Sequence, residues 1–336
     1  MSDSHPGQDR RRPWRPRVRH PHDREIVRLA LPAFGALVAE PLFLLTDSAI
    51  VGHLGTPQLA GLGVAGALLA TVVSVCVFLA YGTTAAVARR VGAGDLRAAL
   101  AQGIDGIWLA AGLGVVLAVG GLLLADPLVA AFGTSEVATP YALTYLRVSL
   151  PGVPAMLVVL AATGVLRGLQ DTRTPLVVAV VGAVANVVLN LVLVYPVGLG
   201  IAGSALGTVL AQLGMAVAFT VVVVRGARRY DAPLRPHLRG IRAAGATGVP
   251  LLLRTVTLRA ALLVMTYVAA SIGTASLAAH QVAFTIWTFL ALALDAVAIA
   301  GQAIVGRYLG ASDAAGARSA TRRMVEWGVV AGIVLG

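Results

Sequence analysis

Two acidic residues, Asp47 and Glu40, lie inside a stretch that is otherwise almost wholly apolar. Residues 26–51 are long enough to cross a bilayer, and an ionisable group there costs roughly 2.5–3.5 kcal/mol on insertion scales. Such groups commonly face a water-filled path for a proton, an ion or a substrate. Seven residues along a helix return to nearly the same face, so both carboxyl groups are expected on one stripe.

Asp47 is the stronger candidate for proton chemistry. Burial among apolar groups disfavours the charged form of a carboxyl group, so Asp47 is predicted to load and release a proton near neutral pH. The alternative is a structural hydrogen bond between helices. Glu40 either lines the same cavity or bonds to the backbone that Pro41 frees, because proline removes one helical hydrogen bond.

Further polar residues lie in later apolar segments. Asn186 and Asn190 are four residues apart, so they share a helix face and can present amides to one partner; the alternative is a purely structural contact between helices. Asp295 is predicted to line the substrate cavity or to form an ion pair with Arg254 or Arg259. Arg254 can extend to the cytoplasmic face, whereas Arg259 lies deeper and needs a partner.

The composition is that of a polytopic, all-α membrane protein. Hydrophobic residues make up 58% of the chain, charged residues 12%, and the mean hydropathy is +0.85, against about 45–50% and 25% in soluble domains. The net charge of +11 comes from arginines in an N-terminal tail and in alternate loops. That placement is typical of membrane orientation and not of nucleic-acid binding. The single cysteine, Cys76, excludes an intrachain disulfide.

Windows of about 20 apolar residues predict eight spans and the start of a ninth. They lie near residues 26–52, 59–86, 102–125, 141–166, 175–197, 202–224, 246–271 and 277–304, and the ninth begins near residue 324.

Arginines are concentrated in every second loop. The loops that follow the second, fourth, sixth and eighth spans hold, in turn, Arg89, Arg90 and Arg97; Arg167 and Arg173; Arg225, Arg228, Arg229, Arg235, Arg239 and Arg242; and Arg307, Arg318, Arg322 and Arg323. The intervening loops 53–58 and 196–203 hold none. The N-terminus and the arginine-rich loops are therefore predicted to be cytoplasmic.

The sequence matches itself at one offset. Pro250 lies 218 positions after Pro32, and at the same offset Arg89, Gly92, Ala93 and Asp95 fall on Arg307, Gly310, Ala311 and Asp313. An even number of spans separates the copies, so both have the same orientation, and we expect a parallel repeat about an axis along the membrane normal.

The repeat predicts two six-helix lobes, of which the second is truncated. Residues 1–24 are predicted to be a disordered basic tail, residues 25–225 the N-lobe, 226–243 a cytoplasmic linker and 244–336 a partial C-lobe. A complete second copy would need about 100 further residues, or three more spans.

Two motifs carry a resemblance to a known family. A first span reading Leu45-Thr46-Asp47-Ser48-Ala49-Ile50-Val51-Gly52-His53-Leu54-Gly55 and the segment Ala278-Ala279-His280-Gln281-Val282 resemble the multidrug and toxic compound extrusion (MATE) transporters. The chain is most similar to their DNA-damage-inducible protein F (DinF) branch, and the resemblance covers about residue 25 to the C-terminus.

The resemblance implies a MATE/MOP-like fold and a coupling site. It places proton binding on Asp47, Asn186, Asn190 and Thr208, the last within Gly203-Ser204-Ala205-Leu206-Gly207-Thr208, and a first-span bend at Pro32, with Pro41 as a second candidate. Relatives often have an aspartate where this chain has Asn190, a departure that removes one titratable group. The secondary polar positions remain Glu40, Asp295, Arg254 and Arg259.

The predicted function is secondary active efflux of cationic or amphipathic small molecules in exchange for protons. Two lobes would alternate access, in a monomer that crosses the cytoplasmic membrane of the cell. No Gly-x4-Gly-Lys-Ser/Thr or His-Glu-x-x-His motif occurs, so an ion gradient is the expected energy source, and neither a cofactor nor an enzymatic activity is expected. The alternatives are sodium coupling, and a lipid-linked sugar flippase or polysaccharide exporter of the same superfamily.

Overall fold

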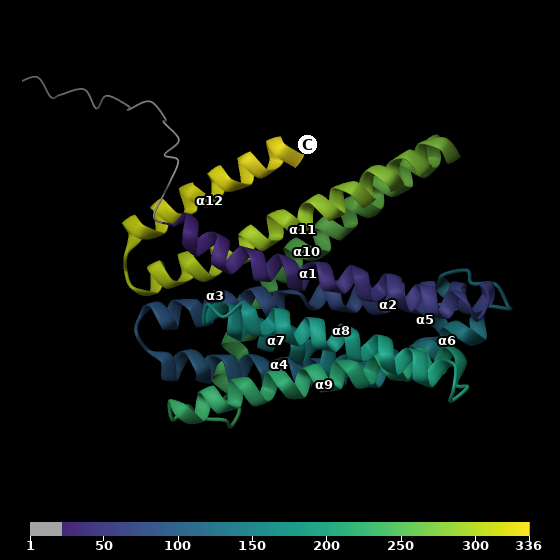
Figure 1. Cartoon of the computed structure of the whole chain (residues 1–336), viewed down its shortest axis with the longest axis horizontal. Helices are drawn as coiled ribbons and strands as arrows, with labels where there is room; N and C mark the ends of the chain where they lie inside the picture. The colour runs from purple at the N-terminus through teal and green to yellow at the C-terminus, as the bar shows by residue number, and fades with distance from the viewer. Residues whose placement is uncertain (1–21, 336) are drawn as a thin grey trace, which may run out of the picture.

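The computed structural model describes residues 22–335 (Figure 1), so almost all of the predicted tail lies outside the described residues. The described residues form helices joined by short turns, with no strand among them. The first helices are α1 (Asp23–Gly52), α2 (Thr56–Cys76), α3 (Phe78–Gly92), α4 (Leu96–Leu123), α5 (Ala125–Ala131) and α6 (Thr139–Ser149). After them come the 3-10 turn η1 (Leu150–Gly152), α7 (Val153–Gly168), α8 (Arg173–Val194), α9 (Gly200–Arg229), α10 (Leu238–Ile272), α11 (Thr274–Gly310) and α12 (Ala314–Leu335).

Eight segments are long and apolar enough to cross a membrane, which confirms the eight predicted spans. The second combines α2 and α3, and the fourth combines α6, η1 and α7. The predicted ninth span lies within α12, which begins earlier, at Ala314, and is not among these eight segments. The first turns of α12 carry Arg318, Arg322 and Arg323, which a hydropathy window passes over but a helix accommodates.

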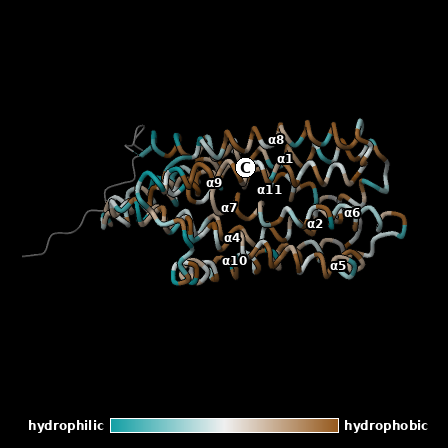
Figure 2. Tube along the Cα trace, turned by 90° about the horizontal axis from the view of Figure 1, so that it is seen from below, coloured by the Kyte–Doolittle hydropathy of each residue, from teal (hydrophilic) through white to brown (hydrophobic). Residues whose placement is uncertain are grey.

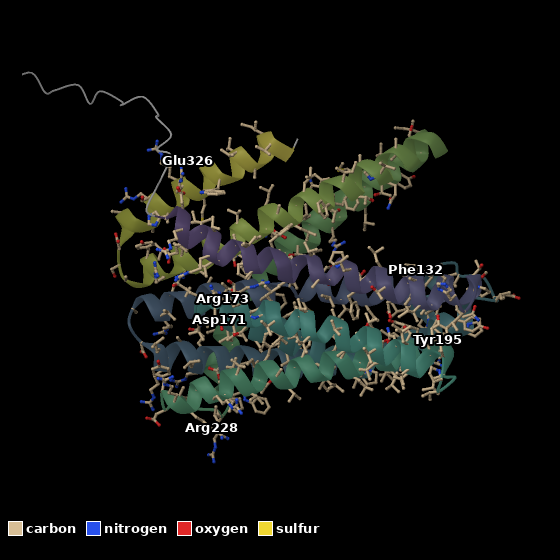
Figure 3. All side chains as sticks on the ribbon, in the orientation of Figure 1. Phe132, Asp171, Arg173, Tyr195, Arg228 and Glu326 are labelled. Carbon is tan, nitrogen blue, oxygen red and sulfur yellow. The ribbon has the colours of Figure 1, made fainter. Side chains whose placement is uncertain are left out.

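Hydropathy divides the bundle into an apolar middle and polar ends. In Figure 2 hydrophobic residues run along the middle of the helices, and hydrophilic residues gather at the ends. Figure 3 places Asp171, Arg173 and Arg228 toward one end and Phe132 and Tyr195 toward the other. The arginine-rich loops therefore share one end of the bundle, as alternate loops of a multi-pass protein must.

The helices α2 to α9 pack into one bundle around two apolar clusters. One cluster joins α2, α4, α6 and α7, and the other joins α3, α4, α7 and α9. Helices α10 and α11 lie side by side, and Figure 1 shows their right-hand ends well away from α1 and α2.

Helix α1 contacts both parts of the protein. Near its beginning, Ile26 and Leu29 pack against Ala300, Ala303 and Ile304 of α11. Near its end, the buried residues of α1 belong to the bundle formed by α2 to α9, and α1 packs extensively on α8. Helix α1 is therefore one of the elements that connect the two parts.

Both prolines of the first span lie inside α1, which continues through Pro32 and Pro41 without a break. Pro32 lies within the segment that packs against α11, because Leu29 and Ala33 on either side of it contact that helix. Pro41 follows Gly35, where α1 already approaches Leu176 of α8. Each proline leaves one helical carbonyl without its usual donor, so the predicted bend stays a prediction for these two positions.

The predicted repeat is visible in local backbone geometry. Gly55 has φ 138° and Gly273, its partner at an offset of 218, has φ 143°; glycine is required there because a Cβ atom disfavours positive φ. Asp95 accepts a hydrogen bond from the N–H of Ala98 (2.8 Å), and its partner Asp313 accepts one from the N–H of Gly316 (2.7 Å). The same sequence signals therefore begin the same helices in both copies, while the boundaries assigned to the lobes and their linker stay predictions.

Two repeat-related glycines bring α3 and α11 into backbone contact at the arginine-rich end. A Cβ atom on Gly92 would overlap the carbonyl oxygen of Arg307, and one on Gly310 would overlap the carbonyl oxygen of Arg89. The contact is reciprocal, so the local two-fold axis of the repeat passes through this crossing. Substitution of either glycine must push the two helices apart.

Ion pairs beside the crossing tie α1 to α11 and α12. Arg307 pairs with Glu25 (2.8 Å) and donates a hydrogen bond to Oε1 of Gln170 (3.0 Å). Arg323 donates two hydrogen bonds to Asp23 (2.6 and 2.8 Å). The bidentate Arg323–Asp23 pair combines strength with fixed geometry, and together the pairs fasten the beginning of α1 to α11 and α12.

The segment between α9 and α10 is fastened to α4. Nε of Arg97 donates to the carbonyl oxygen of Asp231 (3.0 Å), and the indole N–H of Trp108 donates to that of Leu234 (3.1 Å). The carboxylate of Asp105, only 6% exposed, accepts the N–H of His237 (2.9 Å), the residue before α10. Asp105 therefore caps α10 from a neighbouring helix, a role that the sequence pattern did not reveal.

We expect Asp105→Ala to lower stability by about 1–2 kcal/mol, as loss of a helix cap usually does. Thermal unfolding of the purified chain in detergent would measure this effect. Asp126→Ala is the matched control, because Asp126 pairs with Arg147 at an exposed site, where ion pairs contribute little. Equal melting temperatures for the two variants would contradict the capping role.

Candidate functional site

Asp47 lies in the last turns of α1, where its side chain is only 2% exposed. The phenolic O–H of Tyr145 in α6 donates to Oδ2 (3.0 Å), and the hydroxyl of Ser204 in α9 donates to Oδ1 (3.1 Å). The amide of Asn190 in α8 also donates to Oδ1. Three helices thus each supply one neutral donor to this carboxylate.

The two asparagines of α8 extend this set of hydrogen bonds. Nδ2 of Asn190 also lies 3.3 Å from Oδ1 of Asn186, and Nδ2 of Asn186 donates to the hydroxyl of Thr208 (3.1 Å). Asn186 and Asn190 are 1% and 0% exposed. The structure therefore brings together Asp47, Asn186, Asn190 and Thr208, the four residues grouped by the family resemblance.

Helix α9 approaches α8 closely because Gly207 has no side chain. A Cβ atom at Gly207 would overlap Oδ1 of Asn190, an oxygen that is buried and accepts no hydrogen bond from the described residues. The glycine thus fixes the position of the asparagine amide beside Asp47.

We expect Gly207→Ala to destabilise the protein by about 1–3 kcal/mol through overpacking and to weaken transport by displacing Asn190. Melting temperature and vesicle transport would be measured together. Gly214→Ala is the matched control on the same helix, since nothing lies within 4 Å of a Cβ there. Normal transport by Gly207→Ala would show that the position of the amide is unimportant.

No cation contacts Asp47 among residues 22–335, and its partners there are a phenol, an alcohol and an amide. Hydroxyl groups can donate to a carboxylate or accept from a carboxylic acid by rotating their O–H bonds. The hydroxyl groups of Tyr145 and Ser204 can therefore hydrogen-bond Asp47 in both of its protonation states. An arginine partner would instead hold the group in its charged form.

Tyr145 and Ser204 are the two site residues that sequence reasoning missed. Ser204 precedes Thr208 by four residues, so the helical period could have placed both hydroxyls on one face of α9. Tyr145 gave no comparable signal. Its position depends on the break at η1, which separates α6 from α7 within one apolar segment.

Glu40 does not join this site. Asp47 is buried in the bundle, but Glu40, two turns earlier, is exposed and makes no hydrogen bond or ion pair with the described residues. The assignment of Glu40 to the substrate cavity or to the backbone freed by Pro41 therefore stays a prediction. Helix α1 packs on α11 near its beginning and on the bundle near its end, so residues two turns apart on one face have different surroundings.

The later intramembrane charges form a separate group. Asp295 and Arg254 are exposed and lie within electrostatic range of each other, but no ion pair within 4.0 Å joins them, and Arg259 is exposed without a partner among the described residues. Arg167, predicted as a loop residue, lies instead in the last turn of α7 and is only 8% exposed. The charges of Arg167 and Asp295 lie within electrostatic range of each other.

The arrangement of helices matches solved transporter structures. The chain superposes on a MOP superfamily transporter from Pyrococcus furiosus with a TM-score of 0.84 at 24% identity, over 93% of this chain and 70% of that one. Eight apolar spans in this arrangement define a multi-pass membrane protein with the fold of the MATE/MOP transporters.

The sequence comparison then gives the family. The MatE family model matches residues 32–192 and 250–336, so the chain belongs to the MatE family of membrane transporters. It is 34% identical to Protein DETOXIFICATION 44, chloroplastic, of Arabidopsis thaliana, over 84% of this chain and 56% of the relative. It is 30% identical to DNA damage-inducible protein F of Escherichia coli, over 87% of this chain and 64% of the relative. The chain thus spans less than two thirds of the length of these two relatives.

Proposed function

We propose that the protein is a secondary exporter that couples efflux of amphipathic or cationic small molecules to proton entry. The observation that carries this proposal is the environment of Asp47, a buried carboxyl group held by three neutral donors. Such a group can exist in both protonation states, as a coupling site requires. Membership of the MatE family supports the transport class.

The hydrogen-bonding partners describe how protonation would change the site. A protonated Asp47 donates one hydrogen bond, and Oδ1 of Asn190 is the buried acceptor without a partner. Rotation of the Asn190 amide would present this oxygen to Asp47 in place of Nδ2. Because Asn190 touches Gly207 and Asn186, this rotation would alter packing between α8 and α9.

The contacts at the two ends of the bundle indicate which state of alternating access the structure would represent. The Gly92–Gly310 crossing and the pairs of Arg307 and Arg323 hold the arginine-rich end together, whereas α10 and α11 lie away from α1 and α2 at the other end (Figure 1). The positive-inside rule assigns the arginine-rich end to the cytoplasm. The structure would then correspond to an outward-facing state, in which protons enter from outside and trigger the change to the inward-facing state.

Efflux of a fluorescent cationic dye from vesicles containing the purified chain would test the proposal. An imposed proton gradient should drive dye movement, and a sodium gradient of equal size at constant pH should not. Movement driven by sodium alone would replace proton coupling with sodium coupling. Equal movement without any gradient, or chemical cleavage of the substrate, would reject secondary transport altogether.

A lipid-linked sugar flippase or polysaccharide exporter is the second candidate. It is favoured by one observation, the presence of Arg167 and Arg254 together between the two parts of the protein. Anionic phosphate groups of lipid-linked sugars would suit such positions. Scrambling of a labelled lipid-linked sugar in the same vesicles, without dye transport, would favour this candidate.

A further inference from the structure

Arg167 is a buried cation without a hydrogen-bonding partner. It is 8% exposed, its Nε is wholly buried, and no hydrogen bond or ion pair links it to any residue that the structure describes. Its helix is pressed against α3, since a Cβ on Gly164 would lie 2.5 Å from the carbonyl oxygen of Ala80 and one on Gly168 2.9 Å from that of Thr84. The base of the Arg167 side chain is therefore held between α7 and α3, and only the tip of its guanidinium group is open.

Two side chains from other helices lie within electrostatic range of Arg167. Tyr81 of α3 and Asp295 of α11 interact with it electrostatically, and Asp295 also interacts with Arg254 of α10. Tyr81 packs on the apolar cluster formed by Ala33, Ala296 and Ile299, at the junction of α1 and α11. We call Tyr81, Arg167, Arg254 and Asp295 the inter-lobe charge cluster.

The charges of this cluster do not balance. Two guanidinium groups face one carboxylate, which leaves an excess of one positive charge, and arginine stays protonated at any accessible pH. A buried cation without a counter-charge costs free energy. Asp295 does not neutralise Arg167, because their charged groups are more than the 4.0 Å of an ion pair apart.

We propose that the inter-lobe charge cluster binds one anionic group, a carboxylate or a phosphate ester, carried by an amphipathic molecule. Arg167 would be the anchor, since its guanidinium can bind such a group through two parallel hydrogen bonds. Exposed Arg254 would contact the same group from the opposite helix pair, and the phenol of Tyr81 can donate a further hydrogen bond. The carboxylate of Asp295 offsets one of the two guanidinium charges, so the site has room for one anionic group.

This inference rests on the proposed transport function only in treating the bound molecule as a substrate. It narrows the amphipathic class to molecules that carry one negative group. The helices α3, α7, α10 and α11 each contribute one side chain to the site. Binding there therefore depends on how the two parts of the protein pack against each other. A ligand there would bind differently to the two states of the transporter, which is what alternating access requires.

The test compares three naphthalene probes that differ only in their charged group: naphthoate, naphthyl phosphate and naphthylmethylammonium. Their binding to the purified chain in nanodiscs of zwitterionic lipid is measured by fluorescence anisotropy. We expect the anionic probes to bind about tenfold more tightly than the cationic one. The ratio of the affinities for naphthoate and naphthyl phosphate shows whether the site prefers a carboxylate or a phosphate. Addition of anionic phosphatidylglycerol as a competitor shows whether a lipid headgroup occupies the site.

Substitutions of the arginines and of Asp295 are expected to change naphthoate affinity in opposite directions. Arg167→Gln should weaken naphthoate binding about tenfold, and Arg254→Gln, at an exposed position that should not affect folding, should weaken it about threefold. Asp295→Asn should strengthen it about threefold, because it removes a like charge. Arg90→Gln is the control, an exposed arginine on α3, and should leave binding unchanged.

Equal affinities for the three probes would overturn the inference, as would unchanged naphthoate binding in both Arg167→Gln and Asp295→Asn. If naphthoate binds only to the Asp295→Asn variant, Asp295 is the counter-ion of Arg167 in the unmodified protein. That result would also reject the anion site. The binding measurement needs no gradient. Normal probe binding by a protein that fails to transport would therefore reject the transport mechanism and leave this site intact.

Discussion

Asp47→Asn should abolish gradient-driven export while the protein remains folded. Asparagine has nearly the volume of aspartate. Its oxygen at the Oδ1 position can still accept from Ser204 and Asn190, and its NH2 group at the Oδ2 position can donate to the hydroxyl of Tyr145. The packing of α1 against α6, α8 and α9 should therefore survive. The amide cannot take up a proton in the relevant pH range. Dye efflux driven by a proton gradient should fall to the level of protein-free vesicles, while dye binding persists.

The control for this result is Asp126→Asn, the same chemical change at an exposed ion pair with Arg147. It should transport normally. Gradient-driven export by Asp47→Asn at the rate of the unmodified protein would remove Asp47 from the mechanism. A melting temperature far below that of Asp126→Asn would mean that the carboxylate is structural.

Gly310→Ala and Gly92→Ala should each open the arginine-rich end of the protein. The added methyl group would meet a backbone carbonyl of the opposite helix, which cannot move without displacing that helix. Overpacking of this kind costs about 1–3 kcal/mol, a large part of the difference between two transporter states. Because both substitutions act at one crossing, the double variant should cost less than the sum of the single ones.

Labelling of a cysteine at position 88 would measure the opening. Ala88 is fully buried beside Gly306, and replacement of the native Cys76 with serine leaves Ala88→Cys as the only thiol. A membrane-impermeant maleimide should react slowly in the parent protein and much faster in Gly310→Ala. Gly112→Ala, where a Cβ meets nothing within 4 Å, should react like the parent. Equal rates in all three would show that the crossing is not a closure.

Much of the fold could be predicted from the sequence because membrane insertion leaves clear marks. Apolar length fixes the spans, and the distribution of arginines orders the loops. The repeat was detectable because Gly55, Gly273, Asp95 and Asp313 each have a local task, a positive φ or a helix cap. Local tasks constrain residue identity in both copies.

The tertiary contacts were harder to predict because they join distant segments. Asp47 and Asn190 stood out as polar residues in apolar spans, but nothing local in the sequence brings Tyr145 to Asp47. Arg167 and Asp105 were hidden for another reason. An arginine near a helix end, such as Arg167, is easily taken for a loop residue. Asp105 lies in the third turn of α4, and only its contact with the segment before α10 shows why an aspartate is buried there.

Infrared difference spectroscopy of the purified protein over a range of pH tests the central claim most directly. Asp47 should contribute the C=O stretching band of a protonated carboxyl group that disappears as the pH rises, and Asp47→Asn should lack this band. The band should also diminish when a transported substrate binds, because the proton and the substrate each stabilise a different state of the transporter. A carboxylate signal from Asp47 that persists unchanged across the whole pH range would contradict the account.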